Sequence, residues 1–326
     1  MNGSNNRKIN FMRLPALMIL LLALSASFAG CKRIVEPENK SISVYATFWP
    51  IYAMTDAAME GIPDAELKLL VQPQDGCLRN YQLSDWDAAL LSADADAIIM
   101  GGRGLESFEG LLFGWGESGP AVTAVLYNID LYNQDDVVND EAETHLRGPN
   151  PHLYMSIEGA KKIIESVSAS LLSLDPQYAE KYAGNAENAA RRLDALLKEN
   201  RELLSDYEGR SVILMNEALI YVADDYGLRP VAWIDRESGE NLVDTELDRC
   251  LEQLEASGAR VILIEKQAPQ PLIQALEAKG YAVAKLDVFS TRQAGEGFDA
   301  YIEAQSANAR AISEAFAQVE AWEDED

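Results

Sequence analysis

Alternating apolar and polar positions mark the first strand of the chain, SISVYAT at 41–47. Short apolar runs of the same kind recur, with longer stretches of helical periodicity between them. Further strands are predicted at 66–73, 95–102, 120–128, 211–216, 230–234, 260–265 and 282–288. Strands that alternate with helices indicate an α/β fold with mainly parallel sheets.

The helical stretches differ greatly in length, and one of them is unusually long. Helices are predicted at 50–60, 84–91, 156–172, 175–207, 244–257, 270–279 and 298–320. The stretch at 175–207 begins with Asp175-Pro176, a favourable entry into a helix. It exceeds the average length of globular helices and divides the chain into two α/β halves. We therefore expect a rigid connector there.

The first thirty residues predict export rather than folded structure. They contain three basic residues and no acids, followed by the apolar run LPALMILLLALSASFAG at 14–30. This arrangement is typical of a secretory signal, and an uncleaved anchor helix is the alternative. The end of the run, Phe28 to Cys31, resembles a bacterial lipobox with Phe28 in the place of the usual Leu. We expect a lipid on Cys31 and a polar tether over 31–41.

Composition excludes several classes of function. The chain has 27 Lys and Arg against 53 Asp and Glu, a net charge of −26. Loss of the three basic residues at 1–30 makes this charge −29. Such an acidic chain is repelled by phosphate backbones, so nucleic acid is not an expected partner. With only two His and no nucleophile motif, no hydrolytic triad can be assembled, and we expect no enzyme.

The three cysteines have separate interpretations. Cys31 is the predicted lipid site, which leaves Cys77 and Cys250. An exported chain permits a disulfide between these two. Cys250 also fits a small buried residue in a helix, whereas Cys77 lies in a polar loop. The sequence leaves the state of both thiols open.

Several segments resemble, in order, the solute-binding lipoproteins of zinc and manganese ABC transporters (cluster A-I). They include NPHLYMSIEGAKKIIESV at 150–167, LMNEALIYVADDYGL at 214–228 and the segment 262–287. The resemblance covers about residues 41–318. It implies two α/β lobes joined by one long rigid helix, with a ligand cleft between the lobes. The predicted boundaries are 42–173 for the N-terminal lobe, 174–207 for the helix and 208–326 for the C-terminal lobe.

The resemblance implies a metal site that is only partly retained. Members of this family hold the metal with three His and one carboxylate. His152 and Asp287 stand at two of these positions. Arg79 and Asn216 stand at the other two. Because Arg stays protonated and has no lone pair to offer, Arg79 cannot bind a metal ion.

Other residues near these positions are possible replacements. Cys77 lies two residues before Arg79 and is a soft ligand once deprotonated. Glu217 adjoins Asn216, and Glu265 ends a neighbouring strand. With His152 and Asp287 these residues make a Cys, His and carboxylate set that suits zinc, and the alternative is that Cys77 is an ordinary loop thiol.

Arg79 also supports a different hypothesis. A cleft that contains Arg79, Asn216 and acids, with Trp49 at its mouth, suits a small polar or zwitterionic ligand or a metal chelate. Arg offers a bidentate fork to a carboxylate or phosphate. Arg292, in the loop after Asp287, is a second such fork, although a solvated surface role is the simpler interpretation.

The sequence therefore predicts a membrane-anchored, extracytoplasmic solute-binding protein. Its expected cargo is a divalent transition metal of the zinc or manganese class. The resemblance implies an ABC permease and its ATPase as partners, with the lipid at Cys31 as the attachment to the membrane.

Overall fold

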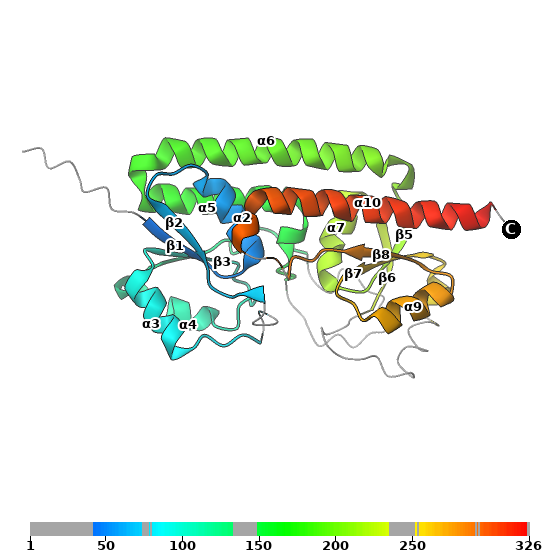
Figure 1. Cartoon of the computed structure of the whole chain (residues 1–326), viewed down its shortest axis with the longest axis horizontal. Helices are drawn as coiled ribbons and strands as arrows, with labels where there is room; N and C mark the ends of the chain where they lie inside the picture. The colour runs from blue at the N-terminus through cyan, green and yellow to red at the C-terminus, as the bar shows by residue number, and fades with distance from the viewer. Residues whose placement is uncertain are drawn as a thin grey trace, which may run out of the picture. The chain divides into compact units, whose positions relative to one another are not determined.

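The computed structural model describes residues 42–73, 78, 80–132, 149–234, 252, 254–290, 292 and 294–324. The chain from Ser41 onward forms one compact unit. Within the described residues, this unit contains two four-stranded sheets in which all paired strands are parallel (Figure 1). The predicted α/β class with two parallel sheets is thereby confirmed.

The two sheets have the same strand order. The first runs β2-β1-β3-β4 and the second β6-β5-β7-β8. Their strands are β1 Ile42–Ala46, β2 Ala65–Leu69, β3 Ala97–Met100, β4 Ala121–Ala124, β5 Ser211–Leu214, β6 Arg229–Trp233, β7 Val261–Glu265 and β8 Ala282–Leu286. In each sheet the order reverses beside the first strand, between β1 and β3 or between β5 and β7. Ligands of open parallel sheets bind beyond the carboxyl ends of the strands at such points.

Helices cover the sheets and connect the two lobes. The first lobe is the part of the chain built on the first sheet, and the second lobe is the part built on the second sheet. The helices are α2 Trp49–Met59, α3 Asp85–Asp94, α4 Glu109–Phe113, α5 Ile157–Leu174, α6 Ala179–Leu203, α7 Ile220–Asp225, α9 Gln270–Ala278 and α10 Gly297–Glu323. In Figure 1, α6 runs along both lobes, whereas α10 begins beside α2 and runs along the second lobe. The predicted long helix corresponds to α6, which has 25 residues, but α10 is longer, with 27. The lobes are therefore joined by the long helix α6, as predicted, and α10 begins near their boundary.

Apolar residues on successive strand positions face opposite sides of each sheet. In β3, Ala97 and Ile99 belong to the central core, whereas Ile98 and Met100 belong to a second cluster on the other face. The strand β5 behaves alike, with Val212 and Leu214 in the central core and Ile213 in a third cluster. This alternation follows from the two-residue repeat of a strand that is buried on both faces.

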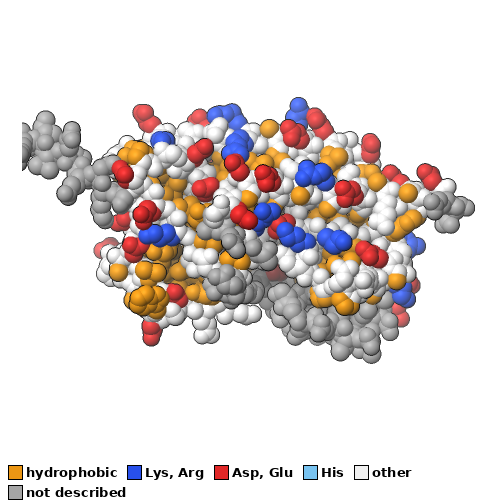
Figure 2. Space-filling model, viewed as in Figure 1, with side chains coloured by type: hydrophobic (Ala, Val, Ile, Leu, Met, Phe, Trp, Pro, Cys, Tyr) orange, Lys and Arg blue, Asp and Glu red, His pale blue; other side chains and the backbone are white. Residues whose placement is uncertain are grey.

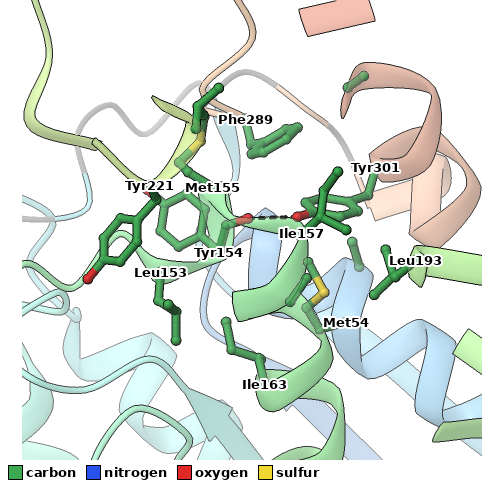
Figure 3. Close-up of a cluster of buried hydrophobic side chains, with 14 of the residues drawn as sticks. Met54, Leu153, Tyr154, Met155, Ile157, Ile163, Leu193, Tyr221, Phe289 and Tyr301 are labelled. Carbon is green, nitrogen blue, oxygen red and sulfur yellow. Dashed lines mark hydrogen bonds between the residues drawn. The ribbon is translucent and has the colours of Figure 1, made fainter. Parts of the chain in front are cut away.

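The central core is shared by the two lobes. It contains Val44 and Ile99 of the first sheet, Leu263 and Leu286 of the second, and Leu193 of α6. Figure 3 shows one part of it, where Met54, Ile163 and Leu193 lie near Tyr154, Phe289 and Tyr301. Continuous apolar packing of this kind resists separation of the lobes.

Local signals in the sequence explain several helix boundaries. Ser84 begins α3 through a capping box, in which its hydroxyl accepts the backbone N–H of Asp87 and the Asp87 carboxylate accepts that of Ser84. Asp175 and Pro176 end α5 and start a 3₁₀ turn, Pro176–Tyr178, from which α6 continues. The predicted helix entry is thus correct, although the first turn is 3₁₀ rather than α.

The surface carries charges of both signs and one apolar area over α3 and α4 (Figure 2). The exposed apolar side chains in these helices are Trp86, Leu90, Leu111 and Phe113. None of the helices in the described part of the chain combines the length and apolar character needed to cross a bilayer.

Candidate functional site

The segment that carries His152 lies between the lobes and is held by buried polar contacts. Asn150, which is 1% exposed, donates from its backbone N–H to the Tyr132 carbonyl oxygen at 2.8 Å. Its side-chain amide donates to the Glu217 carbonyl oxygen at 2.9 Å. The Tyr221 hydroxyl donates to the Asn150 carbonyl oxygen at 2.7 Å, and burial raises the pKa of Tyr221, so this phenol stays a donor. The bonds with Glu217 and Tyr221 attach the segment to the second lobe.

The same Asn150 orients the imidazole of His152. Its Oδ1 accepts the backbone N–H of His152 at 3.1 Å and lies 2.9 Å from His152 Nδ1. Because that oxygen is only an acceptor, Nδ1 carries the proton. Glu217 Oε1 lies 3.6 Å from the same Nδ1. The lone pair of neutral His152 is therefore on Nε2, the atom that is suited to bind a metal ion.

Five residues after His152, helix α5 begins at Ile157 with a contact to the other lobe. Asp225, at the end of α7, accepts the Ser156 hydroxyl at 2.7 Å and the Ile157 backbone N–H at 2.5 Å. Asp225 is 3% exposed, and burial raises its pKa to about 6. The Tyr301 hydroxyl of α10 donates to the Tyr154 carbonyl oxygen at 2.9 Å (Figure 3). The end of the His152 segment is thus fixed by α7 and α10.

Three of the predicted residues stand at the carboxyl ends of strands in the second lobe. Asn216 follows β5, and its Oδ1 accepts the Ala218 backbone N–H at 2.9 Å, so that it caps the 3₁₀ turn Glu217–Leu219. Glu217 is next along the chain, with a side chain that is 15% exposed. Glu265 is the last residue of β7 and is partly buried.

The fourth predicted residue in this lobe, Asp287, is engaged by two cations. It directly follows β8, and its Oδ2 lies 2.5 Å from Lys266 Nζ and 3.1 Å from a terminal nitrogen of Arg292. The Asp287 side chain is 5% exposed, so this charge is compensated within the protein. Arg292, which the sequence favoured as a solvated loop residue, is an ion-pair partner instead. Lys266 was not predicted at all.

Aromatic rings connect His152 with the neighbourhood of Asp287. The ring centroids of His152 and Tyr154 are 5.8 Å apart, those of Tyr154 and Phe289 6.5 Å, and those of Phe289 and Trp49 5.5 Å. The prediction of Trp49 at an open mouth is wrong, because the stacked Phe289 ring covers it and leaves Trp49 3% exposed. These ring contacts link His152 with Phe289, whose backbone N–H donates to Asp287.

The predicted ligand set as a whole stays a prediction. Cys31, Cys77, Arg79 and Cys250 lie outside the described residues. Within the part of the chain that the structure describes, no three His, Cys, Asp or Glu side chains are gathered closely enough to hold a metal ion. Among the described residues, His152 has an unprotonated ring nitrogen, Nε2, that suits a metal ion. The Glu217 carboxylate lies instead beside the protonated nitrogen of His152, Nδ1. Additional ligands must come from elsewhere in the chain, from rearrangement or from water.

The chain matches one family model and is similar to proteins described as zinc-binding or zinc-uptake proteins. The family model for zinc-uptake complex component A, periplasmic (ZnuA), matches residues 44–315. The chain is 24% identical over 309 residues to the zinc-binding lipoprotein AdcA of Streptococcus pneumoniae serotype 4, which covers 91% of this chain and 60% of AdcA. It is 21% identical over 278 residues to the high-affinity zinc uptake system protein ZnuA of Bacillus subtilis, covering 83% of this chain and 85% of that protein.

Solved structures share the fold at low sequence identity. The solute-binding protein FpvC of Pseudomonas aeruginosa in complex with Ni²⁺ has a TM-score of 0.70 and 21% identity, and covers 84% of this chain and 98% of FpvC. The complex of the same protein with Mn²⁺ gives a TM-score of 0.69. The chain spans about 60% of the length of AdcA, so the activity of the whole AdcA protein is not assigned to this chain.

Proposed function

The chain belongs to the ZnuA family of periplasmic zinc-uptake components, and from this membership we propose that it is the solute-binding protein of an ABC importer for a divalent transition metal. The proposed cargo is of the zinc or manganese class. The proposed binding place is the region between the lobes where His152 lies. An ABC permease and its ATPase would receive the metal.

The observation that carries this proposal is the orientation of His152. Asn150 and Glu217 both face Nδ1, at 2.9 and 3.6 Å, and so direct the lone pair to Nε2. Acceptors that fix the second ring nitrogen in this way are typical of metal-bound histidines. Cys77 and Glu265 remain proposed additional ligands, and Glu217 would join them only after turning away from Nδ1.

The proposed location is extracytoplasmic, with a lipid on Cys31 as the membrane anchor. The support is the basic and apolar pattern of residues 1–30 and the small residues before Cys31. The relative AdcA is described as a lipoprotein. Metabolic labelling with a radioactive fatty acid, compared between the wild type and Cys31→Ser, tests this part of the proposal separately.

A second candidate ligand is favoured by the cations at Asp287. Lys266 and Arg292 place two positive groups beside the predicted carboxylate ligand, at 2.5 and 3.1 Å. Cations at this point suit a zwitterionic solute or a metal that is already chelated by a carboxylate carrier. Arg79, outside the described residues, would add a further cation to such a site.

Calorimetric titration of the purified chain tests both candidates. We expect heat and thermal stabilisation with zinc or manganese chloride, because binding to the native state alone stabilises it. His152→Ala should weaken this binding by at least about tenfold, which corresponds to about 1.4 kcal/mol. His145→Ala is the matched control, because it removes the other His of the chain.

Two results would count against metal capture. One is the absence of heat and of stabilisation with either chloride salt. The other is equal binding by the wild type and His152→Ala. Binding of zinc citrate as an intact complex, with no response to zinc chloride, would favour the second candidate.

A further inference from the structure

The meeting of Lys266 with Asp287 follows from the alignment of two strands. β7 and β8 pair in parallel with Glu265 opposite Leu286, so the next residues leave the sheet side by side. The backbone N–H of Lys266 donates to the Leu286 carbonyl oxygen at 2.7 Å. Strand register therefore brings Nζ of Lys266 to 2.5 Å from Oδ2 of Asp287.

Asp287 is fixed in place from several directions. Its Oδ1 accepts the Phe289 backbone N–H at 2.8 Å. Its own backbone N–H donates to Asn308 Oδ1 of α10 at 2.7 Å, and its carbonyl oxygen accepts the Asn308 amide at 3.0 Å. The Asn308 contacts hold the backbone, and the carboxylate cannot turn toward a ligand without losing the buried hydrogen bond from Phe289.

Arg292 reaches the same oxygen and also contacts the first lobe. Its Nε and one terminal nitrogen lie 3.2 and 3.1 Å from Asp287 Oδ2. Its other terminal nitrogen lies 3.4 Å from Glu296. The guanidinium carbon is 5.9 Å from the ring centroid of Trp49, the first residue of α2. Arg292 is thus positioned at the boundary between the lobes.

A metal ion on Asp287 would have to displace both cations. Their nitrogens already contact Oδ2, and like charges at such distances repel strongly in a partly buried place. The Lys266 side chain is 44% exposed and that of Arg292 is 23% exposed. Both have contact with solvent, yet each would lose an ion pair by moving.

We propose that Lys266 and Arg292 are internal counter-cations that keep Asp287 out of the coordination sphere of the cargo metal. The inference rests on the proposed function, because it concerns the binding of the same cargo. The two residues determine specificity: they lower the affinity for a free divalent cation, and their neutralisation makes Asp287 available as a ligand. In the wild type, metal binding then depends on His152 and hardly on Asp287.

Zinc titration in competition with a chelator of known affinity tests this proposal. Lys266→Gln and Arg292→Gln should each bind zinc at least about tenfold more tightly than the wild type. Lys285→Gln is the matched control, because it removes the same charge from an exposed position of β8, two residues before Asp287. Its affinity should stay within about twofold of the wild type, since an exposed charge is screened by solvent.

A double-mutant cycle identifies Asp287 as the origin of the gain. Asp287→Asn alone should change zinc affinity by less than about threefold, because the side chain does not contact the metal. The same change in the Lys266→Gln background should abolish the tighter binding. Thermal unfolding of every variant shows whether it is folded, and the Arg292→Gln background provides a second, independent cycle.

The outcomes separate this inference from the proposed function. If the wild type binds zinc but neither neutralised variant binds more tightly, the inference is wrong and the proposed function stands. A tenfold loss in Asp287→Asn alone would also overturn the inference. Zinc binding that appears only in the neutralised variants would support the inference and contradict the proposed function. Absence of zinc binding in every variant would overturn both.

Discussion

The tautomer of His152 depends on a single neighbouring amide. Asn150 Oδ1 must accept from the His152 backbone N–H, so the nearby Nδ1 can only be a donor. The chemical role of His152 therefore comes from a residue two positions earlier in the chain. The resemblance pointed to His152, but the part played by Asn150 is visible only in the structure.

Asn150→Ala should weaken zinc binding by about 10- to 100-fold, because the imidazole loses the partner that fixes its orientation. The change also removes buried hydrogen bonds, at a cost to folding of about 1–3 kcal/mol. Asn200→Ala is the control: Asn200 is buried and donates to the Tyr226 hydroxyl at 3.0 Å. Calorimetry should show that Asn200→Ala lowers stability but leaves zinc affinity unchanged. Equal zinc affinities of Asn150→Ala and Asn200→Ala would contradict the role of Asn150.

Sequence patterns could not reveal the partners of Asp287. Lys266 follows a strand-ending Glu265, and the sequence predicted that strand end correctly. Which strand lies beside β7, and in which register, is a tertiary property. The ion pair depends on both. The type of residue at the end of a strand can therefore be predicted from the sequence, whereas the residue with which it forms an ion pair cannot.

Secondary-structure elements were predictable where periodicity and capping agreed. The strands β1 and β7, for example, lie within the predicted ranges 41–47 and 260–265 with small shifts at their ends. Packing between elements was not predictable. The start of α5 illustrates this, because Ser156 caps its own helix at Gly159 while Asp225 of α7 accepts from both Ser156 and Ile157.

The contact between α7 and α5 should make stability depend on pH through Asp225. Burial raises the pKa of Asp225 from 3.8 to about 6, so the folded protein binds a proton more readily than the unfolded chain. Stability due to this group should therefore fall as pH rises from about 4 to about 6, by at most about 1.4 kcal/mol per pH unit, and stay level above that range.

Denaturant unfolding of the wild type and Asp225→Asn over pH 4 to 7 measures this effect. The stability of the wild type relative to the variant should decrease between about pH 4 and pH 6. Asp224→Asn is the control, because Asp224 is the exposed neighbour in the same helix. A difference that is independent of pH, or one that Asp224→Asn reproduces, would show that Asp225 is not the responsible group.

The molecule as a whole places the candidate site inside a continuous structure. One apolar core includes residues of both sheets, and α6 extends along both lobes (Figure 1). The sequence predicted two α/β halves and a connecting long helix, but it did not reveal that the two lobes share one apolar core. A shared core and a long bridging helix support binding with only small lobe movement.

The central claim is that this scaffold captures a divalent metal through one histidine, His152. X-ray absorption spectroscopy of the zinc-loaded chain measures this directly, because imidazole scattering counts the bound histidines. The account predicts one imidazole per zinc, at about 2.0–2.1 Å, which disappears in His152→Ala. Sulfur scattering at about 2.3 Å would identify Cys77 as a further ligand. Bound zinc without imidazole, or a spectrum that His152→Ala leaves unchanged, would contradict the account.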